Sequence, residues 1–327
     1  MRTTLATFFA GLLSSAWCLP VEDSQASLFY QRQLAELPKT WIENIAVRRN
    51  GNLLLNTFNN GQMYTADPSQ SPLQPRIIAK VEGVNALYGI TEVGRDIFAV
   101  AGANFDPATM AMPDQSSMRL AVVSFQSDRQ FTDGNPSVEV ILKNTTFGAV
   151  NGLTSLSCQR HIVLGAISAT GEILRVNTKT RVADIAFKDE EFTIGSSGLF
   201  PFGVNGLKIF NSYLYFTNTN RQTFGRVKID KLGNKVGNVE IITRAPANST
   251  LTPDDFVIDK LGNAYVGFWP SLLVKIAPDG KQTILVNGTL AGPTSEALSR
   301  DGKTLYTVTA GLGLATVGGG QILEAKV

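Results

Sequence analysis

The side chains that could do chemistry in this sequence are mostly oxygen donors. Glu43 and Asp254 carry carboxylates, and Asn85, Asn151 and Asn205 carry amides. Such oxygens are the ligands that Ca²⁺, or Mg²⁺ with its waters, prefers, whereas zinc favours His and Cys. If these side chains meet, they form a site for a hard divalent cation. The alternative is that they cap strand ends and hydrogen-bond one another.

These residues open the copies of one repeated phrase. Each copy has a polar residue, a short apolar stretch, a Gly/Asn/Asp turn and a second apolar stretch, and the copies open at Glu43, Asn85, Asn151, Asn205, Asp254 and Ser295. Repeats of about 40–50 residues built from short strands are typical of β-propellers. The sequence therefore predicts an all-β fold, a six-bladed β-propeller of four-stranded antiparallel blades over residues 41–327.

The propeller geometry predicts where a site lies. The innermost strands all begin at one face, so the six opening residues should form the floor of a central channel. Loops after the second strands arrive at the same mouth and should form its wall. This wall is expected to contain Asn56, Phe58, Asn104, Ser168, Asn218, Asn220, Arg221, Phe268, Trp269 and Leu312. The long segment 102–117, with Phe105, Met110 and Met112, is either a lid over the pore or a surface loop.

Blade one shows the expected strand pattern. Strands are predicted over 43–48, 53–58, 62–66 and 76–81, with a hairpin turn at Asn50-Gly51-Asn52. The last blade has a third strand at 320–327 but no sequence left for a fourth. Residues 29–37 could supply it and close the ring, which would hide open sheet edges. The alternative for this segment is a short capping helix at 24–36.

The N-terminus predicts secretion. One basic residue, an apolar core and small residues up to Ala16 indicate a signal peptide over 1–16, followed by an N-terminal segment over 17–40. Sequons for glycosylation occur at Asn144, Asn248 and Asn287. Cleavage after Ala16 would leave Cys18 free to form a disulfide with Cys158, whereas later cleavage would leave Cys158 as a lone buried thiol. We expect the secretory pathway or the extracellular space.

Several classes of function find no support in the sequence. The net charge is +2 without a Lys/Arg cluster, so no nucleic-acid partner is expected. No apolar run after the signal peptide is long enough for a membrane span. The single histidine, His161, stands in an apolar strand, and no Gly-X-Ser-X-Gly elbow occurs. Apolar small molecules are the expected partners of a monomer, because the predicted mouth is aromatic.

The Glu43 copy, the triplet Asn205-Gly206-Leu207 and the pair Pro253-Asp254 resemble the senescence-marker-protein/gluconolactonase family of six-bladed propellers. The resemblance implies that Glu43, Asn151, Asn205 and Asp254 surround a divalent metal. The sequence departs from the family at Asp255, where the family has Gly, and in lacking an acidic neighbour of Asn151.

The stretch 41–47 is also similar to a fungal branch of secreted propellers. That branch includes secondary-metabolite enzymes resembling hetero-Diels–Alderases, which join a quinone methide to a terpene alkene.

Three functions follow as hypotheses. The first is a fungal hetero-Diels–Alder coupling, for which no cofactor is required. In this reaction Arg221 and Asn218 would polarise the oxygen-bearing partner, and Glu43 would help to orient it. Tyr88, Phe202, Asn205, Phe268 and Trp269 would then bind substrate. The second is a Ca²⁺-dependent lactonase, and the third is a non-catalytic secreted binder of small molecules.

Overall fold

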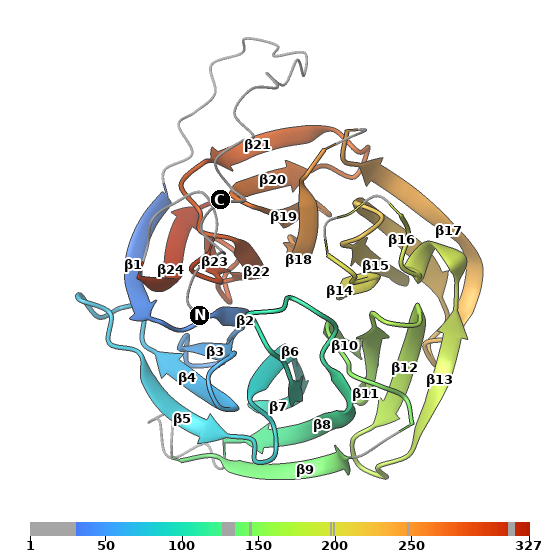
Figure 1. The fold of residues 1–327 in the computed structure, drawn as a ribbon, viewed down its shortest axis with the longest axis horizontal. Coiled ribbons are helices and arrows are strands. Elements are labelled where there is room, and N and C mark those ends of the chain that lie inside the picture. The colour runs from blue at the N-terminus through green and yellow to red at the C-terminus, as the bar shows by residue number, and fades with distance from the viewer. Residues whose placement is uncertain are drawn as a thin grey trace, which may run out of the picture.

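Short strands and tight turns build six four-stranded antiparallel sheets around a central axis (Figure 1). The computed structural model describes residues 31–125, 135–143, 146–196, 198, 200–246, 249–312 and 318–327. Within them the one helix is a 3-10 turn, η1 (Glu190–Phe192). The predicted fold class, a six-bladed β-propeller, is confirmed.

Each blade runs outward from the axis in chain order, except the last. Blade one holds β2 (Ile42–Val47), β3 (Leu53–Thr57), β4 (Gln62–Ala66) and β5 (Arg76–Lys80); blade two holds β6 (Ala86–Gly94), β7 (Ile97–Asn104), β8 (Asp114–Ser124) and β9 (Ser137–Lys143). Blade three holds β10 (Leu153–Leu156), β11 (Gln159–Ile167), β12 (Glu172–Asn177) and β13 (Ala183–Lys188). Blade four holds β14 (Val204–Phe210), β15 (Tyr213–Asn218), β16 (Thr223–Ile229) and β17 (Lys235–Arg244). Blade five holds β18 (Thr252–Ile258), β19 (Ala264–Trp269), β20 (Leu272–Ile276) and β21 (Gln282–Asn287).

Blade six closes the ring with strands from both ends of the chain. It holds β22 (Pro293–Leu298), β23 (Thr304–Thr309), β24 (Gly319–Lys326) and, outermost, β1 (Gln31–Pro38). Residues 31–38 therefore form a strand and not the alternative capping helix. The strand lies so close to β24 that a Cβ on Gly319 would stand 1.8 Å from the carbonyl oxygen of Leu37. Only glycine permits this approach.

Local turn chemistry sets the hairpins of the blades. In blade one the Asn50 side-chain oxygen accepts the Asn52 N–H at 3.0 Å, and Gly51 takes a φ of 93°, a region that favours glycine. The four strands of this blade lie within one residue of the predicted ranges.

Packing between neighbouring sheets forms the core and buries both faces of the inner strands. All five residues of β3 and all six of β23 are buried. A strand buried on both faces shows no alternation of apolar and polar residues. Among the described residues, no helix is long and apolar enough to cross a membrane.

Candidate functional site

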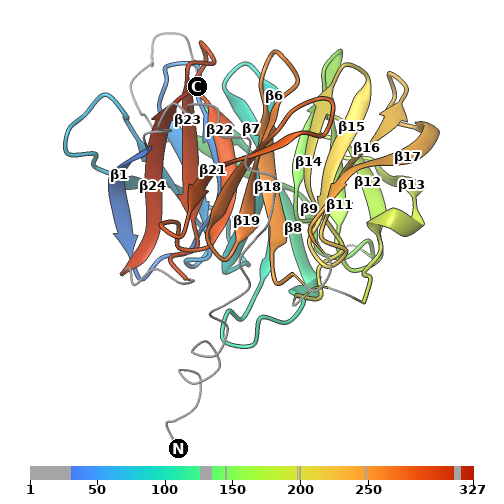
Figure 2. The ribbon, with the colours of Figure 1, turned by 90° about the horizontal axis from the view of Figure 1, so that it is seen from above.

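A pocket opens on the central axis at the face where the inner strands begin. The loop 105–113, between β7 and β8, projects from this face (Figure 2). The pocket encloses about 620 Å³, counting its open mouth. Its apolar lining includes Trp41, Phe58, Tyr88, Phe105, Met110, Met112, Phe200, Phe202 and Trp269, and its polar lining includes Glu43, Gln115, Asn151, Ser168, Asn205, Thr219 and Asp254.

One wall of the pocket is a continuous set of aromatic rings. Trp41 stacks on Phe58 with ring centroids 5.0 Å apart, and it packs against Trp269 at 5.5 Å. Phe58 in turn packs against Tyr88 at 4.8 Å, and Trp269 meets Phe200 edge-on at 5.6 Å. These rings come from segments far apart in the sequence. Together they form a rigid apolar surface suited to a hydrocarbon or a flat ring.

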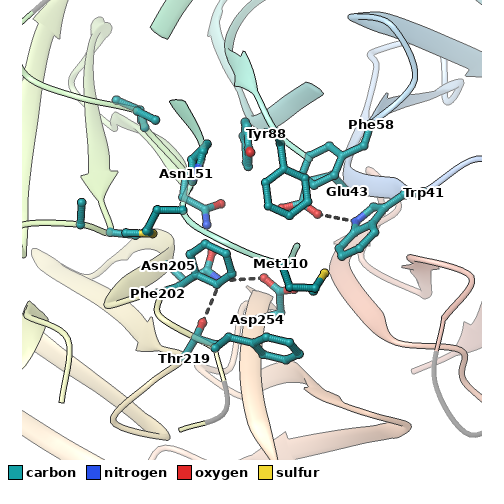
Figure 3. A pocket seen from close by; sticks show the side chains of 18 of the residues that line it. Trp41, Glu43, Phe58, Tyr88, Met110, Asn151, Phe202, Asn205, Thr219 and Asp254 are labelled. Atoms are coloured by element: carbon teal, nitrogen blue, oxygen red, sulfur yellow. Dashed lines mark hydrogen bonds between the residues drawn. The ribbon is translucent and has the colours of Figure 1, made fainter. Parts of the chain in front are cut away.

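The two carboxyl groups of the pocket each accept a hydrogen bond from a tryptophan of this wall. Trp41 Nε1 donates to Glu43 Oε2 at 2.7 Å (Figure 3). Trp269 Nε1 donates to Asp254 Oδ2 at 3.2 Å. Asn205 Nδ2 donates to Asp254 Oδ1 at 2.8 Å and to Thr219 Oγ1 at 2.9 Å. The carboxyl groups therefore fix the orientation of both indole rings.

Burial shapes the electrostatics of these carboxyl groups. It raises the pKa of Glu43 well above its usual range, and the negative charge of Asp254 adds to the effect. Burial, together with the charge of Asp255, raises the pKa of Asp254 to about 7. The site therefore favours either a proton on these groups or a cation between them.

Beneath the pocket floor, Asp255 is the centre of a separate polar cluster. Its side chain is 3% exposed and forms an ion pair with Lys208 Nζ, at 2.6 Å to Oδ1 and 2.8 Å to Oδ2. Oδ2 also accepts from Asn44 Nδ2 at 3.0 Å and from Ser295 Oγ at 3.2 Å. Between Pro253 and Phe256 the register of β18 against β19 shifts. This bulge lets two successive aspartates serve two different places.

The predicted floor is partly right in its placement. Glu43, Asn151, Asn205 and Asp254 all line the pocket. Asn85 does not; its side chain accepts from the Phe105 N–H at 2.8 Å and donates to the Phe105 carbonyl at 2.9 Å, so it holds the start of loop 105–113. Ser295 is fully buried in the cluster around Asp255.

The predicted polarising pair, Arg221 and Asn218, lies outside the pocket, so this expectation is wrong. Asn218 Nδ2 donates to the carbonyl oxygens of Glu191 and Thr193, at 3.0 and 2.9 Å. Arg221 Nε also donates to the Thr193 carbonyl, at 3.0 Å. Both side chains therefore hold the η1 segment, Asn218 from the end of β15 and Arg221 from the turn that follows it.

Some of the other predicted wall residues line the pocket and some do not. Tyr88, Phe202, Trp269, Phe58 and Ser168 line the pocket. Phe268 is packed into the core with 5% exposure, so its expected place in the site is wrong. The remaining predicted members lie outside the lining: Asn56, Asn104, Asn220 and Leu312.

Sequence reasoning missed Thr219, which lines the pocket, and placed its neighbours Asn218 and Asn220 in the wall instead. Both neighbours donate to backbone carbonyl oxygens outside the pocket. Trp41, directly before β2, lines the pocket beside Glu43. Phe105, Met110 and Met112 do line the pocket, as expected of a loop over the pore.

The oxygen-bearing side chains of the pocket are candidate ligands for a metal ion. In the described part of the chain, no group of three or more His, Cys, Asp and Glu side chains is arranged to hold an ion. The oxygens of Asn151 and Asn205 extend the pair of carboxylates, and this all-oxygen chemistry fits a hard cation. Glu43, Asn151, Asn205 and Asp254 are the residues that would hold it.

The remaining predicted sites lie away from the pocket or outside the described residues. Cys158 is exposed in the turn between β10 and β11, which corrects the alternative of a buried thiol. Its proposed partner Cys18, the signal peptide 1–16 and the sequons Asn144 and Asn248 lie outside the described residues. Asn287 is exposed at the end of β21. His161 is on β11 and does not line the pocket.

Comparison with known proteins gives sequence similarity to two proteins with related names. Putative hetero-Diels-Alderase asR5 of Sarocladium schorii is 28% identical over 215 residues, which span 59% of this chain and 52% of that protein. A Putative hetero-Diels-Alderase of Phoma sp is 27% identical over 290 residues, 81% of each chain. The chain thus matches about half of the first relative and most of the second. No family model matches it.

The fold has counterparts among solved structures. The calcium-binding protein regucalcin of Agrobacterium tumefaciens aligns over 91% of this chain and 95% of its own, with a TM-score of 0.61 and 16% identity. At this identity the likeness concerns the fold. The chain is therefore a six-bladed β-propeller whose fold resembles that of regucalcin, and its sequence is similar to those of proteins named putative hetero-Diels-Alderases.

Proposed function

We propose that this protein accelerates a hetero-Diels–Alder coupling of a quinone methide with a terpene alkene in secondary-metabolite biosynthesis. The observation that carries the proposal is the lining of the pocket, which combines an aromatic wall with a few buried polar groups. The sequence similarity to two proteins named for this reaction supports it.

The reaction suits such a pocket. In the coupling, the oxygen and terminal carbon of the quinone methide bond to the two alkene carbons, and no atom leaves. The protein therefore needs neither a nucleophile nor a strong base. It must hold the partners in a reactive pose and polarise the oxygen-bearing one.

We assign these tasks to other residues than the sequence analysis did. Trp41, Phe58 and Trp269 are the rings that would hold the hydrocarbon, in place of Phe268. Glu43, Asn205 and Asp254 would orient the oxygen-bearing partner from the floor. Loop 105–113 would cover both, because Met110 and Met112 contribute flexible apolar side chains to the lining.

The test is an incubation of purified protein with an ortho-quinone methide precursor and humulene, compared with the spontaneous reaction. We expect a faster reaction and one dominant stereoisomer. Trp269→Ala should lower the rate at least tenfold by removing part of the wall, a loss in the range expected for misplaced reactants. Leu261→Ala is the matched control, since Leu261 is 81% exposed. A wild-type rate and product ratio equal to those of the uncatalysed reaction would refute the proposal.

A second candidate is a Ca²⁺-dependent lactonase, favoured by the converging oxygens of Glu43, Asn151, Asn205 and Asp254. A bound Ca²⁺ or Mg²⁺ would act as a Lewis acid on a carbonyl oxygen. Lactone hydrolysis that requires added Ca²⁺, without any coupling, would select this function. Ligand binding without turnover of either substrate would select the third candidate, a non-catalytic binder.

We also propose that the protein enters the secretory pathway and acts there as a monomer. The exposed Asn287 lies in an Asn-Gly-Thr sequon and is open to the glycosylation that occurs in this pathway. Mass spectrometry of the secreted protein would test this, together with the predicted start after Ala16 and the Cys18–Cys158 disulfide. A start beyond Cys18, or two free thiols, would contradict the disulfide.

A further inference from the structure

Most hydrogen-bond donors in the pocket are already committed to protein acceptors. The Trp41 and Trp269 indoles donate to Glu43 and Asp254, and the Asn205 amide donates to Asp254 and Thr219. The hydroxyl groups donate elsewhere: Ser168 Oγ to the Val204 carbonyl at 2.6 Å and Thr219 Oγ1 to the Pro253 carbonyl at 2.9 Å. These groups hold the pocket together and leave little for a ligand.

Tyr88 differs from all of them. It lines the pocket, its side chain is 5% exposed, and its hydroxyl has no hydrogen-bond partner among the described residues. A buried hydroxyl without a partner is unfavourable, because it has given up its hydrogen bonds to water without replacing them. Because it is shielded from bulk water, a ligand oxygen is the partner that would remove this cost.

The Tyr88 ring is held in place from several sides. It packs against Phe58, and its backbone carbonyl accepts from the Asn56 side chain at 2.5 Å. The following residue, Gly89, donates its N–H to the Asn151 carbonyl at 3.0 Å, where a Cβ would stand only 2.5 Å from that oxygen. Residues of blades one and three therefore hold this part of blade two in place, as a preorganised donor requires.

We propose that the Tyr88 hydroxyl is the donor that polarises the oxygen-bearing partner, by hydrogen bonding to the carbonyl oxygen of a conjugated ketone such as a quinone methide. The inference rests on the proposed function and replaces Arg221 and Asn218 in that role. The phenol keeps its proton throughout, while the ring oxygen of the product forms from the bonded carbonyl. Burial beside Glu43 raises the pKa of Tyr88 well above its usual value, which keeps it a donor.

Asn151 is the second donor of this kind. Its side chain lines the pocket and makes no hydrogen bond within the described part of the chain. It is only partly buried, so water satisfies it before a ligand arrives. Its effect on a bound carbonyl should therefore be smaller than that of Tyr88.

The test uses Tyr88→Phe, with Tyr64→Phe as the matched control. The Tyr64 hydroxyl stays within blade one, near Gln62 Oε1 at 3.4 Å. Acetophenone serves as a stable conjugated ketone whose C=O stretching frequency, measured by infrared difference spectroscopy, falls when a donor binds the oxygen. We expect a lowered frequency in wild type and Tyr64→Phe, and loss of that shift in Tyr88→Phe. Coupling should slow about tenfold to a hundredfold in Tyr88→Phe alone.

Stability separates this role from a structural one. Because the hydroxyl has no partner, Tyr88→Phe should unfold at the wild-type temperature or slightly above it. An unshifted or unbound ketone in wild type, or an unchanged shift in Tyr88→Phe, would overturn the assignment. Wild type that lowers the ketone frequency but does not accelerate coupling would instead refute the proposed reaction and leave the Tyr88 donor in place.

Discussion

Two layers of buried carboxylates lie one above the other on the propeller axis, and they differ in their partners. In the lower layer Asp255 meets Lys208, Asn44 and Ser295, so its charge is neutralised and its oxygens are satisfied. In the upper layer Glu43 and Asp254 accept hydrogen bonds from indole and amide N–H groups, and neither forms an ion pair within the part of the chain that the structure describes. Asp254 and Asp255, successive residues of β18, therefore differ in role: Asp254 faces the pocket and Asp255 forms an ion pair below it.

The difference separates a structural site from a reactive one. A buried charge with a cationic partner joins segments firmly, here blades one, four, five and six through Asp255. Buried carboxyl groups without one acquire raised pKa values and become responsive to protons, cations and ligands. Asp255 thus has a function in the fold, because its ion pair and hydrogen bonds join four blades below the pocket.

The largest expected effect comes from breaking the lower layer. Asp255→Ala leaves Lys208 without its partner and removes links among four blades, so it should destabilise the fold by about 3 kcal/mol. Urea unfolding measures this. Glu139→Ala is the control, because it breaks an ion pair with Arg181 whose side chains are both more than half exposed; it should change stability by less than about 1 kcal/mol. Similar losses in both variants would remove the distinction between the layers.

The upper layer should respond to pH in the opposite sense from an ordinary ion pair. The Asp254 carboxyl keeps its proton up to a pKa of about 7 when folded, but loses it near its ordinary value when unfolded. The folded state thus holds more protons between these values, so stability should fall as pH rises from about 4 to 7 and then level off.

Asp254→Asn removes this group and tests the sign. In chelator-treated protein, the free energy of unfolding of this variant should fall less steeply with pH than that of wild type. Above pH 7 the variant should be more stable than wild type by on the order of 2 kcal/mol. Unfolding curves from pH 4 to 8 measure the effect. An Asp254→Asn variant that loses stability at pH 8 would show that the Asp254 charge is neutralised after all.

A hard cation should stabilise the upper layer alone. At a hundredfold excess over its dissociation constant, Ca²⁺ or Mg²⁺ should raise the unfolding free energy by about 2–3 kcal/mol. Glu43→Gln should reduce this stabilisation by the cation most, because it deletes a full charge, and Asn151→Ala should reduce it less. Thermal shift titrations after chelation measure both. No shift in wild type would mean that the four donors serve only hydrogen bonding.

The smallest expected effect concerns the link between the upper layer and the aromatic wall. Trp269→Phe keeps a ring but removes the N–H that Asp254 accepts, which should lower stability by about 1 kcal/mol. Thermal unfolding of Trp269→Phe and Trp41→Phe compares the two indole contacts. Equal stability of both variants with wild type would show that the carboxyl groups do not depend on the indoles.

The sequence by itself determined the fold and the approximate place of the site. Turn residues such as Gly51 and the repeated apolar pairs act locally, so six copies specify six blades without knowledge of distant contacts. Because all inner strands of a propeller begin at the same face, the residues at their starts are expected to surround one channel mouth. Glu43, Asn151, Asn205 and Asp254 could therefore be grouped although they are scattered along the chain.

Only the tertiary structure decided which neighbour of each pair enters the pocket. Trp269 rather than Phe268, and Thr219 rather than Asn218, line it. Strands packed between blades are buried on both faces, so their residue types do not reveal which face meets the ligand. The bulge in β18 and the partners of Asp255 depend on contacts with residues as distant as Asn44, 211 positions away. Such long-range contacts leave no mark in a local pattern.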